Sequence, residues 1–132
     1  MRKTYYIIAI TFFLLFCCSC SREYKFIHSI DEINNIEIIE ISEKETVVKK
    51  VLSDEERSEF IIDFRKIKCF SYFNDPSSPA VGTAIKINYS NGDYEIISRE
   101  AQDIYKNKRL LTGMSYFDSE EFDNLIKKYL ES

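Results

Sequence analysis

The stretch AIKINYSNGDYEII, residues 84–97, decides the fold, because apolar and polar side chains alternate on both sides of one turn dipeptide. Alternation with a period of two predicts strands. The dipeptide Asn91-Gly92 suits a two-residue type I′ turn, since both of its residues tolerate a positive φ. The sequence therefore predicts an antiparallel hairpin.

A turn of two residues sets the register of this hairpin, with Ser90 facing Asp93. Glu95 is then expected on the wetter face of the sheet, together with Asn88. The remaining expected neighbours are Tyr89 opposite Tyr94 and Ile87 opposite Ile96, on the same packed face as Ile85.

One amphipathic helix is predicted before the hairpin in the chain, and another after it. Residues 54–66 follow a capping box made by Ser53 and Glu56, and a terminal helix begins after the capping residue Asp118. The apolar residues at helical spacing are Phe60, Ile61, Phe64 and Ile67 in the first helix, and Phe122, Leu125, Ile126, Tyr129 and Leu130 in the second. Such stripes need a sheet to cover, so the expected fold class is α+β: a small two-layer sandwich of an antiparallel sheet with two amphipathic helices.

Three further strands are expected, at residues 36–41, 47–52 and 68–73. Within the first of them, adjacent Ile38 and Ile39 break strict alternation and indicate a bulge or burial on both faces. A capping box at residues 29–32 predicts a brief helical turn. Residues 74–82 hold both prolines and predict an irregular loop, and residues 99–117 predict one more irregular strand.

The first 22 residues are typical of an export signal. Basic Arg2 and Lys3 precede the apolar residues 5–16, and the segment CCSC, residues 17–20, follows. The uncharged run of 18 residues at positions 4–21 reaches the lower end of what crosses a hydrocarbon layer. An uncleaved membrane anchor is therefore the alternative to a cleaved signal peptide.

The segment Cys17-Cys18-Ser19-Cys20 resembles the lipobox of bacterial lipoproteins, in which a small residue precedes the cysteine that receives diacylglycerol. Ser19 and Cys20 match this pattern, whereas Cys17 and Cys18 stand where the family usually has leucine and a small residue. Cys18 is the second candidate for the acylated cysteine. The resemblance implies a signal peptide at residues 1–19 and lipidation of Cys20, and it extends no further than the leader.

Cleavage before Cys20 leaves 113 residues, enough for one domain and too few for two. Residues 20–25 are expected to form the lipidated cysteine and a short tether, and residues 26–132 a single α+β domain. The five residues after the cysteine span about 17 Å when extended. The domain is thus expected outside the cytoplasm, close to the cell membrane or outer membrane, with the lipid bilayer as a partner through the acylated cysteine.

The net charge limits the kinds of partner that the chain can bind, and the cysteine content decides whether disulfides can stabilise the fold. Without residues 1–19 the chain has 16 basic and 22 acidic residues, a net charge near −6, which repels nucleic acid and anionic lipid surfaces on average. Only Cys69 lies outside the leader, so no internal disulfide is expected.

No residue pattern predicts catalysis, a metal site or a cofactor. His28 is the only histidine and is expected to be an ordinary surface or boundary side chain, while Cys69 lies in an apolar strand that favours a buried, inert thiol. The acidic residues within 54–59 and 120–123 lie in the first turns of the predicted helices, where negative charge offsets the helix dipole. The three glycines form no phosphate-binding loop or nucleophile elbow. We therefore expect no enzyme activity.

The aromatic residues that lead into the proline-containing loop are the best candidates for a binding surface. Rigid aromatic anchors beside a stiff loop lose little entropy on binding. The alternative is that these side chains fill the core and the loop only connects strands. The candidate binding residues are Tyr72, Phe73, Asp75, Pro76 and Pro79.

These expectations favour a membrane-anchored lipoprotein that binds another envelope or secreted protein without catalysis. An immunity protein against a basic toxin and an inhibitor of an envelope enzyme both suit an acidic, exported, tethered domain. A structural or stress-related envelope lipoprotein without a tight partner is the first alternative. The second is a hydrolase of cell-wall glycan or peptide that uses carboxylates scattered along the sequence.

Overall fold

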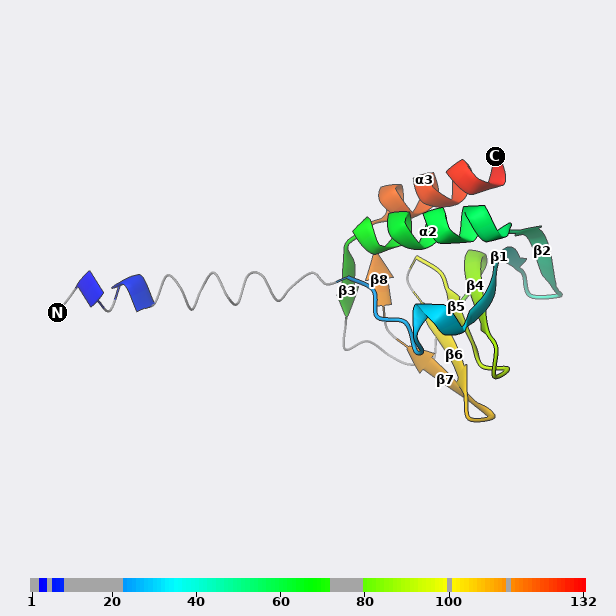
Figure 1. Cartoon of the computed structure of the whole chain (residues 1–132), viewed down its shortest axis with the longest axis horizontal. Coiled ribbons are helices and arrows are strands. Elements are labelled where there is room, and N and C mark those ends of the chain that lie inside the picture. Colours follow the sequence, from blue (N-terminus) through cyan, green and yellow to red (C-terminus); the bar gives the residue numbers. More distant parts are fainter. Residues whose placement is uncertain (1–2, 5, 9–22, 72–79, 100, 114) are drawn as a thin grey trace.

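The computed structural model describes residues 3–4, 6–8, 23–71, 80–99, 101–113 and 115–132 (Figure 1). Its elements are η1 (Ile30–Glu32), β1 (Ile33–Ile41), β2 (Thr46–Val51), α2 (Asp54–Lys66), β3 (Cys69–Ser71), β4 (Gly82–Tyr89), β5 (Tyr94–Ile97), β6 (Gln102–Lys106), β7 (Arg109–Gly113), β8 (Ser115–Phe117) and α3 (Ser119–Leu130). Within these residues no helix is long and apolar enough to cross a membrane. The predicted α+β class is confirmed.

The strands form one six-stranded antiparallel sheet and one separate pair. Their order in the sheet is β2-β1-β4-β5-β6-β7, and β3 pairs with β8. The helices α2 and α3 lie next to each other on one side of the strands (Figure 1). Each helix thereby buries its apolar stripe, which gives the predicted layer of helices on a layer of strands.

The core lies between the two helices and the inner face of the sheet. The rings of Phe60 and Phe64 stack with their centroids 5.7 Å apart, and the Phe64 ring lies 5.4 Å from that of Phe117. The fully buried isoleucines of the strands in this core are Ile36, Ile38, Ile85, Ile87 and Ile97. Of the apolar positions predicted for the two helical stripes, all are buried except Leu130, which is 41% exposed.

Local start signals predicted the helices correctly. The helix α2 spans the predicted residues 54–66, and it begins with reciprocal hydrogen bonds: the Glu56 N–H donates to the Ser53 hydroxyl at 3.2 Å, and the Ser53 N–H donates to the Glu56 carboxylate at 2.9 Å. The helix α3 begins after Asp118, whose carboxylate accepts from the Glu121 N–H at 3.0 Å. Capping bonds of this kind satisfy backbone donors that have no partner within the helix.

The predicted register of the β4–β5 hairpin is wrong by one residue. The turn contains three residues, Ser90 to Gly92, and Gly92 takes a left-handed φ of +91°. Ile87 therefore lies opposite Glu95 rather than the residue after it. Ser90 is held in the loop because its N–H and its hydroxyl donate to the Glu32 carbonyl at 2.9 and 3.1 Å. Since a slip of one residue turns each side chain to the other face, Glu95 points into the core instead of the wetter face.

The described residues 99, 101–113 and 115–117 contain three strands, where only one was predicted. The strands β6 and β7 form a hairpin with the two-residue turn Asn107-Lys108, whose φ angles are +54° and +61°. Lysine seldom adopts the left-handed conformation, so this turn lacks the usual sequence signature. The third strand, β8, pairs with β3, which is distant in the sequence.

The strand β1 shows both features that adjacent isoleucines predicted. Ile38 and Ile39 are both fully buried, and they point to opposite faces of the sheet. The ladder between β1 and β2 also shifts at this pair, where Lys49 of β2 is the extra residue of a bulge. The capping box at residues 29–32 leads into the short turn η1, as predicted.

The folded part of the chain begins before residue 26, the predicted start of the domain. Tyr24 is only 4% exposed, and Glu23 pairs with Arg65 of α2 at 3.0 Å. Both residues were expected to belong to the tether. If the domain is counted from Tyr24, the first buried residue, residues 21–23 would link the lipid to it in a chain lipidated at the predicted cysteine.

Candidate functional site

One carboxyl group lies buried on the inner face of the sheet. Glu95 of β5 is 0% exposed, and its two oxygens accept hydrogen bonds from four donors. The hydroxyl of Tyr24 donates to Oε1 and that of Tyr89 to Oε2. The Ile27 N–H donates to Oε2 at 3.1 Å, and Gln102 Nε2 donates to Oε1 at 3.3 Å. We call these five residues the Glu95 cluster.

The Glu95 cluster joins segments that are far apart in the sequence. Tyr24 comes from the N-terminal segment, Tyr89 from the end of β4, and Gln102 from the start of β6, where its amide also donates to the Tyr24 hydroxyl. The Tyr24 ring packs against the Phe64 ring at 5.2 Å. The carboxyl group therefore fastens the N-terminal segment to both the sheet and the core.

Burial dominates the electrostatics of this cluster. It raises the pKa of the Tyr24 and Tyr89 hydroxyls, and the neighbouring Glu95 charge raises the pKa of each further. Both tyrosines therefore remain protonated donors at neutral pH. Within the part of the chain that the structure describes, no buried side-chain nitrogen or oxygen lacks a hydrogen-bond partner. The arrangement holds a segment in place, and its carboxyl group is closed to solvent.

A second polar group lies at the tips of the hairpins. His28 Nε2 is 2.6 Å from Asp93 Oδ2, and the His28 and Tyr89 rings meet edge to face at 5.0 Å. Asn91 Nδ2 donates to the same Asp93 oxygen at 3.1 Å, and the Asn107 N–H donates to the other at 3.4 Å. These contacts, that of His28 foremost, lower the pKa of Asp93. His28, with a side chain 19% exposed, is the boundary residue that the sequence predicted.

Of the acidic residues at the start of α2, Glu56 caps the helix and also pairs with a lysine. Lys50 Nζ lies 2.7 Å from Glu56 and, together with the capping bond, lowers the pKa of Glu56 to about 2. Further along, Lys128 lies 2.8 Å from Asp63 and lowers its pKa as well. Among the described residues, no group of three or more histidine, cysteine, aspartate or glutamate side chains could hold a metal ion.

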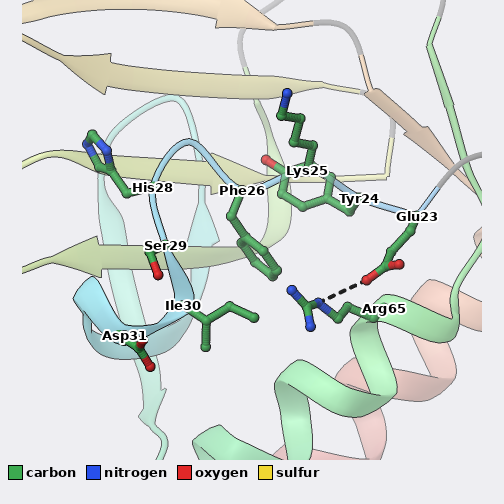
Figure 2. Close-up of a pocket in the computed structure, with 9 residues that line it drawn as sticks. All are labelled: Glu23, Tyr24, Lys25, Phe26, His28, Ser29, Ile30, Asp31 and Arg65. Carbon is green, nitrogen blue, oxygen red and sulfur yellow. Dashed lines mark ion pairs between the residues drawn. The ribbon is translucent and has the colours of Figure 1, made fainter.

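An open hollow of about 740 Å³ lies between the N-terminal segment and α2 (Figure 2). Figure 2 shows Phe26 and Ile30 pointing towards the Arg65 side chain, whose guanidinium carbon is 5.9 Å from the Phe26 ring centre. Arg65 pairs with Glu23, so the charges within the hollow are balanced. Its other lining residues are Tyr24, Lys25, His28, Ser29 and Asp31. This open, mixed lining is typical of a contact surface rather than of an enclosed ligand pocket.

Both outer strands of the six-stranded sheet carry exposed apolar side chains. On β2, Val47, Val48 and Val51 are 38%, 50% and 53% exposed. On β7, Leu110 and Leu111 are 64% and 52% exposed. The backbone of an outer strand can pair with a further strand, so both edges offer main-chain and apolar contacts to a partner.

The binding residues predicted from the sequence lie outside the described residues, as does the predicted lipidation site Cys20. These binding residues are Tyr72, Phe73, Asp75, Pro76 and Pro79. Cys69 lies in β3 and is 6% exposed, which agrees with the predicted buried thiol. Sequence reasoning missed the Glu95 cluster, because it assigned Tyr24 to the tether and Glu95 to the outer face. The available signal was Gly92, which also suits the left-handed position of a three-residue turn.

Comparisons with protein-family models, with curated proteins and with solved structures found no match to this chain. Its function is therefore inferred from its own residues and surfaces.

Proposed function

We propose that this chain is a lipid-anchored protein of the bacterial envelope whose domain binds another protein without catalysis. The resemblance of residues 17–20 to a lipobox supports the anchor. The observation that carries the binding function is the exposed apolar edge at β2.

The strand β2 has the chemistry of a sheet edge that accepts a partner strand. It is an outer strand of the six-stranded sheet, and its three valines are between 38% and 53% exposed. Natural sheets often protect such an edge with lysines. Here Lys50 is turned away to Glu56 and to the Tyr129 carbonyl, both at 2.7 Å, so only Lys49 adds an exposed charge to the strand. The edge is therefore protected only by Lys49 and by the bulge at this residue.

Strand addition also suits an inhibitory or immunity-like role. Main-chain hydrogen bonds to an added strand supply affinity, and the side chains beside them supply specificity. The net charge near −6 outside the leader attracts a basic partner and speeds its encounter with the domain. A basic secreted toxin and a basic envelope enzyme are the two kinds of partner that this surface favours.

Affinity capture from a crosslinked envelope extract tests the proposal. The full chain serves as bait beside a Val48→Glu, Val51→Glu variant and a matched Ile62→Glu control, since Ile62 is 59% exposed on α2. We expect one saturable partner with the unmodified and control baits and none with the edge variant. A Tyr72→Ala, Phe73→Ala bait tests the loop predicted from the sequence in the same experiment.

Hydrogen exchange of the captured complex locates the contact. Strand addition slows exchange of the amides in residues 46–51, because those on the free side gain acceptors. Protection confined to other elements would exclude β2 as the binding edge. A bait that recovers no saturable protein would contradict the binding function itself.

A further inference from the structure

The hairpin β6–β7 joins a basic turn to exposed leucines. Its turn region contains Lys106, Lys108 and Arg109, and Leu110 and Leu111 follow directly. Among the described residues, none of the three cations takes part in an ion pair. Figure 1 shows this hairpin, yellow to orange, projecting from the body on the side away from the two helices.

This composition differs from the rest of the domain. The chain outside the leader is acidic, with a net charge near −6, yet the hairpin tip is cationic. Leu110 and Leu111 are 64% and 52% exposed, and consecutive strand residues point to opposite faces, so the outer strand β7 shows apolar side chains on both sides. Cations beside exposed leucines are typical of segments that lie at the surface of an anionic bilayer.

The N-terminal segment is fastened to β6, the strand next to β7. Tyr24 hydrogen-bonds to Glu95 of β5 and to Gln102 at the start of β6, the strand next to β7. From Gln102 to Lys106 the strand rises about 13 Å. A tether of residues 21–23 spans about 10 Å when extended, so a lipid anchor before it keeps the hairpin within reach of the bilayer.

We infer that the β6–β7 hairpin docks the domain on a bilayer surface rich in anionic phospholipid. The inference rests on the membrane anchor of the proposed function and adds an orientation to it. The strand β2 lies five strand spacings from β7, about 24 Å, so docking through β7 leaves the binding edge at the far end of the sheet.

The anchor makes a weak contact sufficient. Each cation near an anionic surface favours the bound state about fivefold at low salt, so three cations favour docking roughly a hundredfold. The tether supplies a high local concentration of lipid, and the contact needs no strong affinity of its own. Added salt screens these charges and weakens docking.

A single tryptophan reports on the contact, because the chain contains none. The full chain with its anchor is reconstituted as the L110W variant into vesicles of phosphatidylcholine, with or without a third of phosphatidylglycerol, and brominated phosphatidylcholine serves as quencher. V48W is the matched control, since Val48 is 50% exposed on the opposite edge. A second L110W chain, which also carries Lys106→Gln, Lys108→Gln and Arg109→Gln, is the neutralised variant.

We expect the tryptophan of L110W to be quenched in the anionic vesicles and that of V48W to remain unquenched. Neutralisation should lower the ratio of docked to undocked domain roughly a hundredfold, and high salt should lower it too. Equal and weak quenching of L110W and V48W in anionic vesicles would overturn the inference. Quenching of L110W that is equal with and without the three neutralising substitutions would also overturn it. A tryptophan signal that changes only when an acidic protein is added would overturn it as well.

Separate readouts distinguish this inference from the proposed function. Mass spectrometry of the N-terminal peptide reports lipidation, and the capture experiment reports partner binding. If no partner is captured, the quenching result still stands on its own. If the L110W chain is not quenched, the result of the capture experiment is unaffected.

Discussion

Replacement of Glu95 by alanine is expected to lower the free energy of unfolding by about 4 kcal/mol. The carboxyl group is 0% exposed and accepts from Tyr24, Tyr89, Gln102 and the Ile27 N–H. A buried donor that loses its partner costs about 1 to 3 kcal/mol, and the two hydroxyls lose theirs together. The removed side-chain atoms also leave a cavity. Because a domain of this size is stable by only about 5 to 15 kcal/mol, the loss is large.

Urea unfolding of the chain without residues 1–22, followed by far-ultraviolet circular dichroism, measures this loss. The triple variant Glu95→Leu, Tyr24→Phe, Tyr89→Phe removes the acceptor and both hydroxyl donors, so it should be more stable than Glu95→Ala by about 2 kcal/mol. Glu43→Ala, at an exposed position, should stay within about 0.5 kcal/mol of the unmodified chain. A loss below about 1 kcal/mol for Glu95→Ala would refute the structural role of the cluster.

Three further substitutions test the hairpin tips. The hydrogen bond from His28 lowers the pKa of Asp93 in the folded state, so the ionised carboxylate stabilises the fold above the ordinary carboxyl pKa near 4. This stability is lost as the pH falls from that value through the lowered pKa of the folded state. Asp93→Asn should therefore flatten the fall in melting temperature on acidification, and an unchanged slope would contradict this. Lys108→Gly should raise the free energy of unfolding by about 0.5 to 1 kcal/mol, because the φ of +61° costs lysine more than glycine; a lower urea midpoint would oppose it. Gly92→Ala should lower the free energy of unfolding by about 1 kcal/mol, because alanine is strained at the φ of +91°. No atom lies within 4 Å of the added methyl group, so a steric clash does not contribute, and an unchanged urea midpoint would argue against strain.

The helices could be predicted because their signals are local. Ser53 with Glu56, and Asp118 with the apolar spacing after it, define each helix start within a few residues. The strands β6 and β7 could not be found in this way, because their turn places Lys108 in a conformation that glycine usually takes. The pairing of β3 with β8 depends on contacts between distant segments, which no local pattern encodes.

The candidate site was missed for a related reason. Two-residue and three-residue turns both suit a loop that contains Asn91-Gly92, and the choice depends on the hydrogen bonds that Ser90 makes to the distant Glu32 carbonyl. That choice decides which face receives Glu95. Tyr24 was likewise assigned to a tether, because its partner Glu95 lies far along the chain. A buried polar cluster between distant segments is visible only when the register is known.

If the chain is anchored at a membrane, the Glu95 cluster also determines how far the domain can travel from it. In a chain anchored at Cys20, residues 21–23 allow a reach of about 10 Å. A pull on the anchor is transmitted directly to Tyr24 and its buried hydrogen bonds, without a slack linker between them. If residues 24–32 also detached while β1 stayed in the sheet, the extended chain would gain about 30 Å. Opening the Glu95 cluster together with the His28–Asp93 and Ser90–Glu32 contacts would therefore increase the reach of the domain about fourfold.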